Sequence, residues 1–278
     1  MSAGQGPAAP GAKPSAERLN TRAAGIVGLA VMCSRVLGLI REQICAALFG
    51  GGGAMDAFTA AFRIPNLLRD LFAEGALSTA FVATFSKTAV RTNDAAAWRL
   101  ANKIATMAAV VLGALCVLGV VFSPQLVATL APGFNPAKAA LTVTLTRIMF
   151  PFILLVSLAA LVMGMLNAKN VFGMPAMASS FFNVGSIVGG VVLGYWLDPQ
   201  FGPRALYGLA IGTLIGGGLQ LAVQLPHLHR LGFRYRPDFS WRDPGVAAVL
   251  SLMGPSVIAA STTQFNVLVN SIFASHLG

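Results

Sequence analysis

The chain has 278 residues, of which 56% are hydrophobic and 10% are charged. In an ordinary soluble domain about a quarter of the residues are charged. This composition excludes a soluble globular protein and predicts an all-α polytopic membrane protein. The formal net charge of +10 would also suit a nucleic-acid-binding protein, so the positions of the basic residues have to decide.

The first 20 residues are rich in Gly, Pro, Ala and Ser. Such a segment cannot bury enough apolar surface to fold alone, so we predict a disordered cytoplasmic tail over residues 1–20. The apolar stretch behind it runs past Arg35, which favours a retained helix over a cleaved secretory signal.

Apolar runs of about 20 residues or more predict seven membrane spans behind this tail. They cover residues 22–48, 57–86, 100–122, 141–167, 175–197, 204–228 and 246–276. Turn residues separate the spans on the predicted outer side at 50–53, 123–124, 131–133, 198–199 and 202–203. Glycines at four-residue intervals in the fifth and sixth spans predict close helix packing, with a sliding surface for a moving bundle as the alternative: Gly185, Gly189, Gly190, Gly194, Gly208, Gly212 and Gly216.

The basic residues indicate the orientation. With a cytoplasmic N-terminus, the outside loops carry only Lys138 and Arg204. The inside segments then carry twelve basic residues: Lys13, Arg18, Arg22, Lys87, Arg91, Arg99, Lys103, Lys169, Arg230, Arg234, Arg236 and Arg242. The positive-inside rule therefore predicts a cytoplasmic N-terminus, and no nucleic-acid partner is needed to explain the charge.

The last inner connection interleaves basic and aromatic residues between His227 and Asp243. One interpretation is a segment that lies on the membrane surface and meets anionic headgroups. The other is an ordinary positive-inside loop with interfacial aromatic residues.

A dense run of charge interrupts the first two spans. It comprises Arg35, Arg41, Glu42, Asp56, Arg63, Arg69, Asp70 and Glu74. One ionised side chain at mid-bilayer costs at least about 2.5–3.5 kcal/mol, so such charges face a bundle interior or a wet cavity. We therefore predict a polar path for a charged substrate. The simpler alternative is pairing across helices, Arg35 with an acid of the second span.

The spacing of these charges places several on common faces. Helical periodicity gathers four of them on one stripe of the second span: Asp56, Arg63, Asp70 and Glu74. Asn66 lies at the edge of that stripe, and Pro65 predicts a kink that swings Arg69 toward it. In the first span Arg35 and Glu42 share a face.

Guanidinium groups present planar forks of donors that suit phosphate and carboxylate, which predicts an anionic substrate containing phosphate. Asp56 and Glu74 then act as gating or coupling partners. The glycines at 50–53 lack the Gly-Lys-Ser/Thr of a phosphate-binding loop, and no nucleophile elbow occurs. We predict a transporter with no cofactor or metal, driven by an ion gradient or the membrane potential.

Several ungapped motifs resemble the MurJ (MviN) family of bacterial lipid II flippases. The amino-terminal ones are Ser34–Glu42, Met55–Phe58, Arg63–Arg69 and Phe72–Ala76, and further ones are Ala131–Phe134, Phe150–Pro151, Gln224–His227 and Met253–Pro255. The resemblance implies a fold of the multidrug/oligosaccharidyl-lipid/polysaccharide exporter type, in which two lobes enclose a cationic cavity with alternating access. It also implies the bacterial inner membrane as location and the peptidoglycan precursor lipid II as cargo.

The same resemblance assigns roles to residues. The essential cavity arginines of the family match Arg35, Arg41 and Arg69, and with Asn66 they are our candidates for substrate binding. The functional acid of the second helix matches Asp56, which joins Glu42, Arg63, Asp70 and Glu74 as a gating or ion-pair candidate. Pro175 matches a proline that the family uses and is assigned with Pro65 as a helix-kink position.

Two departures from the family pattern stand out. Asp70 replaces a second basic residue that many relatives carry, and the family has about fourteen spans. We therefore assign residues 21–230 to an amino-terminal six-helix lobe, 231–245 to a basic inter-lobe loop, and 246–278 to the first helix of a second lobe.

The expected partners are lipid II, membrane lipids, the missing carboxy-terminal half or a complementary chain, and cell wall synthesis proteins. The alternatives are a non-transporting scaffold for envelope synthesis and an exporter of another polyprenyl-diphosphate-linked sugar.

Overall fold

The computed structural model describes residues 15–50, 52–69 and 77–255, with side chains from residue 25 onward except at positions 64, 68 and 69. These residues form helices and connecting loops, without strands. The helices are α1 (Ser15–Phe49), α2 (Gly53–Arg69), α3 (Ser78–Arg91), α4 (Asp94–Val121), α5 (Ser123–Leu130), α6 (Pro136–Met149), α7 (Phe152–Ala168), α8 (Gly173–Leu197), α9 (Ala205–Ala222) and α10 (Leu225–Arg230). A short helix, Pro244–Pro255, follows them.

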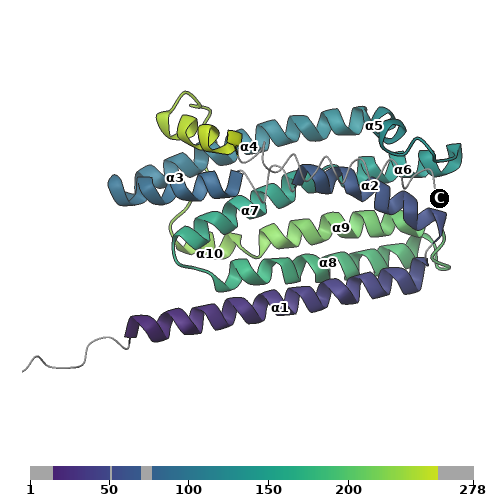
Figure 1. The fold of residues 1–278 in the computed structure, drawn as a ribbon, viewed down its shortest axis with the longest axis horizontal. Helices are drawn as coiled ribbons and strands as arrows, with labels where there is room; N and C mark the ends of the chain where they lie inside the picture. The colour runs from purple at the N-terminus through teal and green to yellow at the C-terminus, as the bar shows by residue number, and fades with distance from the viewer. Residues whose placement is uncertain (1–14, 51, 70–76, 256–278) are drawn as a thin grey trace, which may run out of the picture.

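The long helices run side by side along one direction, so their connections gather at two opposite ends (Figure 1). The turns from α1 to α2, α5 to α6 and α8 to α9 lie at one end, which we call the outer end. The turns from α3 to α4 and α7 to α8 lie at the other end together with α10, and we call this the inner end. The connections predicted to lie outside thus share one end, as the sequence indicated.

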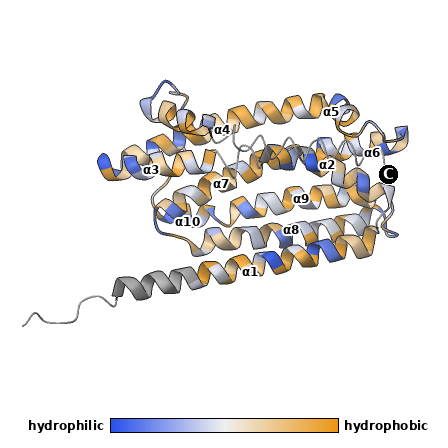
Figure 2. Cartoon of the chain, viewed as in Figure 1, coloured by the Kyte–Doolittle hydropathy of each residue, from blue (hydrophilic) through white to orange (hydrophobic). Residues whose placement is uncertain are grey.

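Four stretches of the described residues are long and apolar enough to cross a membrane: Asp94–Val121, Pro136–Ala168, Gly173–Leu197 and Ala205–Arg230. They correspond to the predicted spans 100–122, 141–167, 175–197 and 204–228. The predicted first span lies within α1, which hydrophilic stretches interrupt (Figure 2). The second is divided between α2 and α3, with 70–76 outside the described residues, as are 256–276 of the seventh.

Local differences from the sequence-based prediction have simple causes. The predicted turn at Ser123–Pro124 begins the eight-residue helix α5, because proline is tolerated in the first turn of a helix. The predicted fourth span consists of two helices, α6 and α7, joined at Pro151. α1 begins at Ser15 and so includes residues 15–20 of the predicted tail, whose residues 1–14 lie outside the described part.

The predicted glycine packing joins α8 and α9. A Cβ atom on Gly208 would lie 2.3 Å from the backbone nitrogen of Gly194, and one on Gly212 would lie 2.3 Å from that of Gly190. These distances are shorter than any side chain can accept, so the glycines are what allow the two backbones to touch. α1 packs along the other side of α8 (Figure 1).

Candidate functional site

The charged helices α1 and α2 border a cavity with α8 and α9 in the outer half of the bundle. Its volume is about 210 Å³, and its lining includes Arg41, Glu42, Cys45, Phe58, Phe62 and Thr213. Most of these groups are apolar, so Arg41 and Glu42 supply the charge of the cavity wall.

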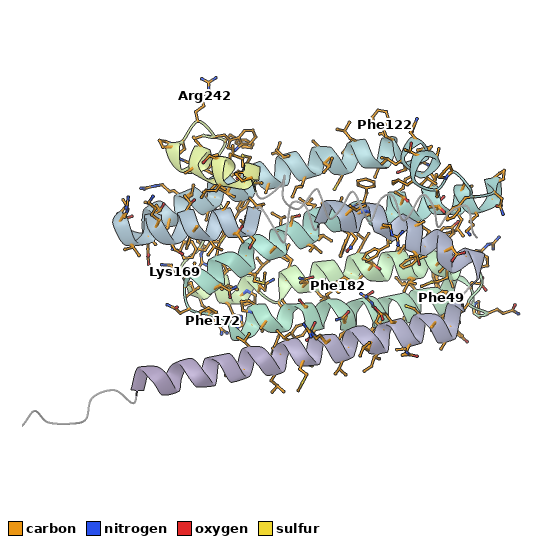
Figure 3. All side chains as sticks on the ribbon, in the orientation of Figure 1. Phe49, Phe122, Lys169, Phe172, Phe182 and Arg242 are labelled. Atoms are coloured by element: carbon orange, nitrogen blue, oxygen red, sulfur yellow. The ribbon has the colours of Figure 1, made fainter. Side chains whose placement is uncertain are left out.

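Arg41 is half-buried, with its guanidinium carbon 5.5 Å from the centre of the Phe182 ring on α8. Phe182 lies between α1 and α9 near the middle of the bundle (Figure 3). A helical side chain leans toward the amino-terminal end of its helix, which for α1 is the inner end. Arg41 therefore extends from the outer part of α1 toward the bundle centre, held by a cation–π contact.

The other charges of α1 are more exposed. Arg35 and Glu42 are both exposed, and within the described residues neither has an acidic or basic partner at ion-pair distance. The carbonyl of Ser34, next to Arg35, accepts a hydrogen bond of 3.1 Å from Asn183 Nδ2 on α8. This bond fixes α1 against α8 at the level of Arg35.

Asp56, in the first turn of α2, pairs with a residue to which sequence reasoning gave no functional role. Lys138 Nζ on α6 lies 2.9 Å from Asp56 Oδ2, and the same ammonium lies 4.3 Å from the centre of the Phe134 ring. The predicted topology could have suggested this pair, because Lys138 is one of only two basic residues predicted on the outer side, where the helix of Asp56 begins.

The remaining candidates on α2 occupy different environments. Arg63 and Asn66 are half-buried, and Pro65 is buried inside the helix, which continues through it to Arg69. The side chain of Arg69 and the residues Asp70 and Glu74 lie outside the described part, so their predicted roles remain predictions.

Two further residues concern the sequence-based assignments. Pro175 is the third residue of α8 and is buried. In a first turn its missing N–H costs no helical hydrogen bond, so this position accounts for the proline without a kink.

Arg147 lies inside the fourth predicted span, and the sequence predicts no role for it. It is exposed on α6, and its Nε donates to the Val120 carbonyl at 3.3 Å.

Chemically, the described lining of the cavity offers the guanidinium of Arg41 beside aromatic rings and an acid next to it on α1, and a separate ion pair lies at the outer end. A guanidinium in a mostly apolar wall favours a multivalent oxyanion over a cation. The arrangement of Arg41 therefore suits binding of a phosphate-bearing group, and it provides no nucleophile activated by a neighbouring base.

Comparisons with known proteins agree with this description. The family model for the lipid II flippase MurJ matches residues 45–278. A probable lipid II flippase MurJ of Buchnera aphidicola subsp. Acyrthosiphon pisum is 36% identical over 253 residues, covering 90% of this chain and 48% of the relative. The lipid II flippase MurJ of Burkholderia cenocepacia is 38% identical over 253 residues, covering 89% of this chain and 48% of that protein.

A solved structure of lipid II flippase MurJ in an inward closed conformation superimposes with a TM-score of 0.73 at 25% identity. It covers 91% of this chain and 51% of the solved one. The chain thus spans about half the length of the relatives it matches. With its all-α membrane-spanning architecture and a family match over most of its length, the chain belongs to the MurJ family of lipid II flippases.

Proposed function

We propose that this chain is the amino-terminal lobe of a flippase that moves lipid II from the cytoplasmic to the periplasmic leaflet by alternating access. Membership of the family supports this proposal, and so do the names of its relatives. The other half of the cavity wall would come from a carboxy-terminal lobe, because the matched relatives are about twice as long.

The observation that carries the proposal is the position of Arg41 in the cavity between α1, α2, α8 and α9. Its contact with Phe182 directs a permanently charged fork toward the bundle centre, where it would bind a pyrophosphate. Arg35 and Arg69 are proposed as the further cationic ligands, with Asn66 as a neutral one.

The ion pair between Asp56 and Lys138 is proposed as a switching contact at the outer end. It connects the first turn of α2 to α6, so its opening would weaken the attachment of that turn to α6. Glu42, Arg63, Asp70 and Glu74 are proposed as the other exchangeable partners during the transport cycle.

The direction of transport follows from the proposed orientation. The basic residues of α3, α4 and α10 gather at the inner end, which we assign to the cytoplasmic side of the bacterial inner membrane. The membrane potential or an ion gradient would supply the driving force, worth about 2.3 kcal/mol per charge and 100 mV.

The test is rescue of a flippase-depleted bacterium by the full-length gene at matched membrane expression. We expect wild type to rescue and Arg35→Ala, Arg41→Ala and Arg69→Ala to fail. Arg204→Ala is the matched control, since it removes an exposed arginine at the outer end and should still rescue. Rescue by all three cavity variants would refute the assigned sites, and failure of wild type would refute the flippase assignment and favour another cargo.

A further inference from the structure

A basic and aromatic segment, residues 233–243, is fixed against the inner part of α4; we call it the docked segment. Asn102 of α4 holds its backbone from both sides, since Nδ2 donates to the Arg234 carbonyl at 3.3 Å and Oδ1 accepts from the Arg236 amide at 3.0 Å. Thr106 Oγ1 accepts from the Asp238 amide at 3.1 Å. The docked segment therefore has a defined place on the lobe.

The sequence of α4 gives the depth of this place in the membrane. No charged residue occurs from Ile104 to Val121, whereas Arg99 and Lys103 precede this run. Lys103 therefore marks the boundary at which the hydrocarbon region begins. Because the docked segment binds Asn102, Lys103 and Thr106, it lies at the level of the lipid headgroups.

The exposed side chains of the docked segment are aromatic and basic. Phe239 is 65% exposed and Tyr235 51%, and the rings of Phe239 and Trp241 lie 5.9 Å apart. Arg236 and Arg242 are also exposed, and Arg242 projects outward from the bundle (Figure 3). Rings beside guanidinium groups are what an interface of acyl chains and phosphates favours.

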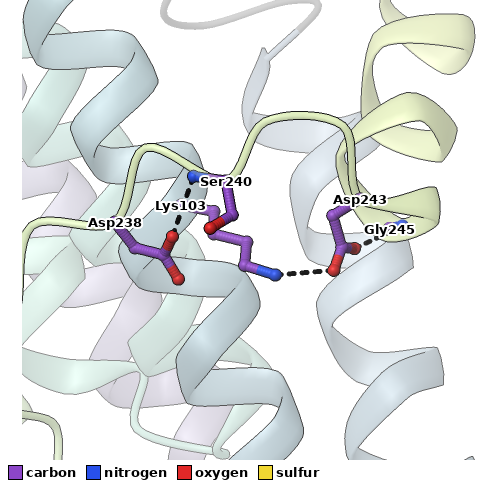
Figure 4. A network of polar contacts seen from close by, with 5 residues as sticks. All are labelled: Lys103, Asp238, Ser240, Asp243 and Gly245. Atoms are coloured by element: carbon purple, nitrogen blue, oxygen red, sulfur yellow. Dashed lines mark hydrogen bonds and ion pairs between the residues drawn. The ribbon is translucent and has the colours of Figure 1, made fainter.

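The two acids of the docked segment are occupied by contacts within the protein. Asp238 Oδ1 accepts from the Ser240 amide at 2.9 Å (Figure 4). Asp243 Oδ2 lies 2.6 Å from Lys103 Nζ, and its other oxygen accepts from the Gly245 amide at 2.7 Å. Neither acid forms an ion pair with an arginine of the segment within the described structure, so Arg236 and Arg242 keep their positive charge for an outside partner.

Arg99 adds a further positive charge from α4. A cavity of about 230 Å³ beside the docked segment is lined by Thr88, Arg99, Lys103 and Asp243 among others. Arg99 is exposed at its wall. The positively charged surface thus extends from the docked segment onto α4 at the same depth.

We propose that the docked segment is a binding site for anionic phospholipids of the adjacent leaflet, separate from the cavity at Arg41. Arg236 and Arg242 bind the headgroup phosphates, while Phe239 and Trp241 contact the acyl chains next to the headgroups. A lipid is favoured over a protein partner because the segment is docked at headgroup depth and combines aromatic rings with arginines that have no acidic partner among the described residues.

Trp241 provides a direct reporter for this site. The chain has three tryptophans, and Trp98→Phe with Trp196→Phe leaves Trp241 as the fluorophore while keeping a ring at each position. The whole chain is reconstituted in phosphatidylcholine vesicles that contain a minor fraction of brominated phosphatidylglycerol or brominated phosphatidylcholine. We expect half-quenching by the anionic lipid at a mole fraction at least about fivefold lower, because each of the two arginines near an anionic surface contributes about 1 kcal/mol, a factor of about five.

The arginine variants test the origin of that preference. Arg236→Gln with Arg242→Gln should remove most of the difference between the two lipids and leave only the contribution of Arg99, and added salt should reduce the difference further. Arg204→Gln, at the outer end, should leave it unchanged. Equal quenching by both lipids in the parent chain would overturn the proposal, and so would a preference that both arginine replacements leave undiminished. Absence of quenching by either lipid would also overturn it and would indicate a protein partner.

Native mass spectrometry of the chain without tryptophan replacements provides an independent measurement. Phosphatidylglycerol adducts should survive detergent removal at energies that strip phosphatidylcholine, and Arg236→Gln with Arg242→Gln should reduce this difference sharply. Equal retention of the two lipids by the unmodified chain would contradict the proposal even if the tryptophan variants fold poorly.

Discussion

Lys138, the third residue of α6, reaches Asp56 in the first turn of α2 with 2.9 Å between Nζ and Oδ2, although 82 positions separate them in the sequence. The lysine side chain is 11% exposed and the aspartate side chain 51%, so water reaches one partner much more than the other. Such half-exposed pairs contribute little to stability, about 0.2–1 kcal/mol. A contact this weak can open and close during a transport cycle.

Removing either partner should therefore impair transport far more than stability. We expect Asp56→Asn and Lys138→Gln each to reduce the free energy of unfolding by less than about 1 kcal/mol, and the double variant to lose no more than one single variant. Rescue of flippase-depleted cells should fall by up to about fivefold in the single variants, since a pair worth up to about 1 kcal/mol shifts a switching equilibrium by that factor.

The exchanged pair, Asp56→Lys with Lys138→Asp, serves as the control. It should restore part of the rescue, because the attraction between α2 and α6 is kept. Additive losses of rescue in the double variant, or no loss in either single variant, would show that the two residues act independently of one another.

A second prediction concerns the contact between α8 and α9. Gly212→Ala would place a Cβ atom 2.3 Å from the Gly190 nitrogen, which forces the helices apart. We expect a loss of about 1–3 kcal/mol in stability, the usual cost of overpacking, measured as a lower melting temperature in detergent.

Gly218 is the matched glycine for this test. It lies in the same helix, and a Cβ atom there would have nothing within 4 Å. Gly218→Ala should leave the melting temperature unchanged or raise it, because alanine favours the helix by up to about 1 kcal/mol. Equal destabilisation by the two substitutions would contradict the packing role of Gly212.

The sequence predicts features that depend on local pattern. The predicted span 100–122 is a nearly continuous apolar run, and the glycines of α8 and α9 recur every four residues; the structure confirms both predictions. The contact of Lys138 with Asp56 leaves no such signal, since it depends on how distant helices pack. The docking of residues 233–243 on Asn102 is equally invisible, because an asparagine in a helix has many possible partners.

Some errors also have a local cause. The pair Ser123–Pro124 predicts a turn because proline is common in turns, but proline is also common at the first position of a helix. The structure resolves this ambiguity through Ser123, whose Oγ donates to the Gly119 carbonyl at 2.6 Å and continues the bonding of α4 into α5. That contact requires the ends of both helices to be in place.

The third prediction is a pH dependence of the docked segment. The hydrogen bond from Lys103 is the main cause that lowers the pKa of the Asp243 carboxyl, helped by the Gly245 amide. A lowered pKa means that the carboxyl stabilises the docked state fully above its ordinary value of 3.8, and that this contribution is lost as the pH falls through the lowered value.

Lys103→Gln should move this loss to higher pH, because the pKa of Asp243 rises toward its ordinary value. Hydrogen exchange of residues 233–243 between pH 3 and pH 6 measures the effect, with protection falling at a higher pH in the variant. Lys87→Gln, an exposed lysine on α3, is the control. Identical pH profiles for Lys103→Gln and wild type would show that the pair does not hold the segment.

The fourth prediction uses a native cysteine to measure the electrostatics of the cavity. Cys45 lines the same cavity as Arg41, one turn further along α1, while Cys116 is buried. With Cys33→Ala, an anionic thiosulfonate reagent should therefore modify Cys45 and leave Cys116 unmodified. Arg41→Gln should slow this reaction by roughly fivefold, since two unit charges about 4 Å apart interact by about 1 kcal/mol even at the dielectric constant of water.

A neutral reagent of the same size separates charge from access, because its rate should not change in Arg41→Gln. Arg147→Gln, which removes an exposed arginine on α6, should leave both rates unchanged. Inorganic pyrophosphate should protect Cys45 in the parent chain and lose most of that effect in Arg41→Gln, because the guanidinium is the cationic group of this wall. If Arg41→Gln instead lowers the modification rates of both reagents equally, Arg41 acts through its packing on Phe182. The other arginines of α1 and α2 would then be the anion-binding candidates.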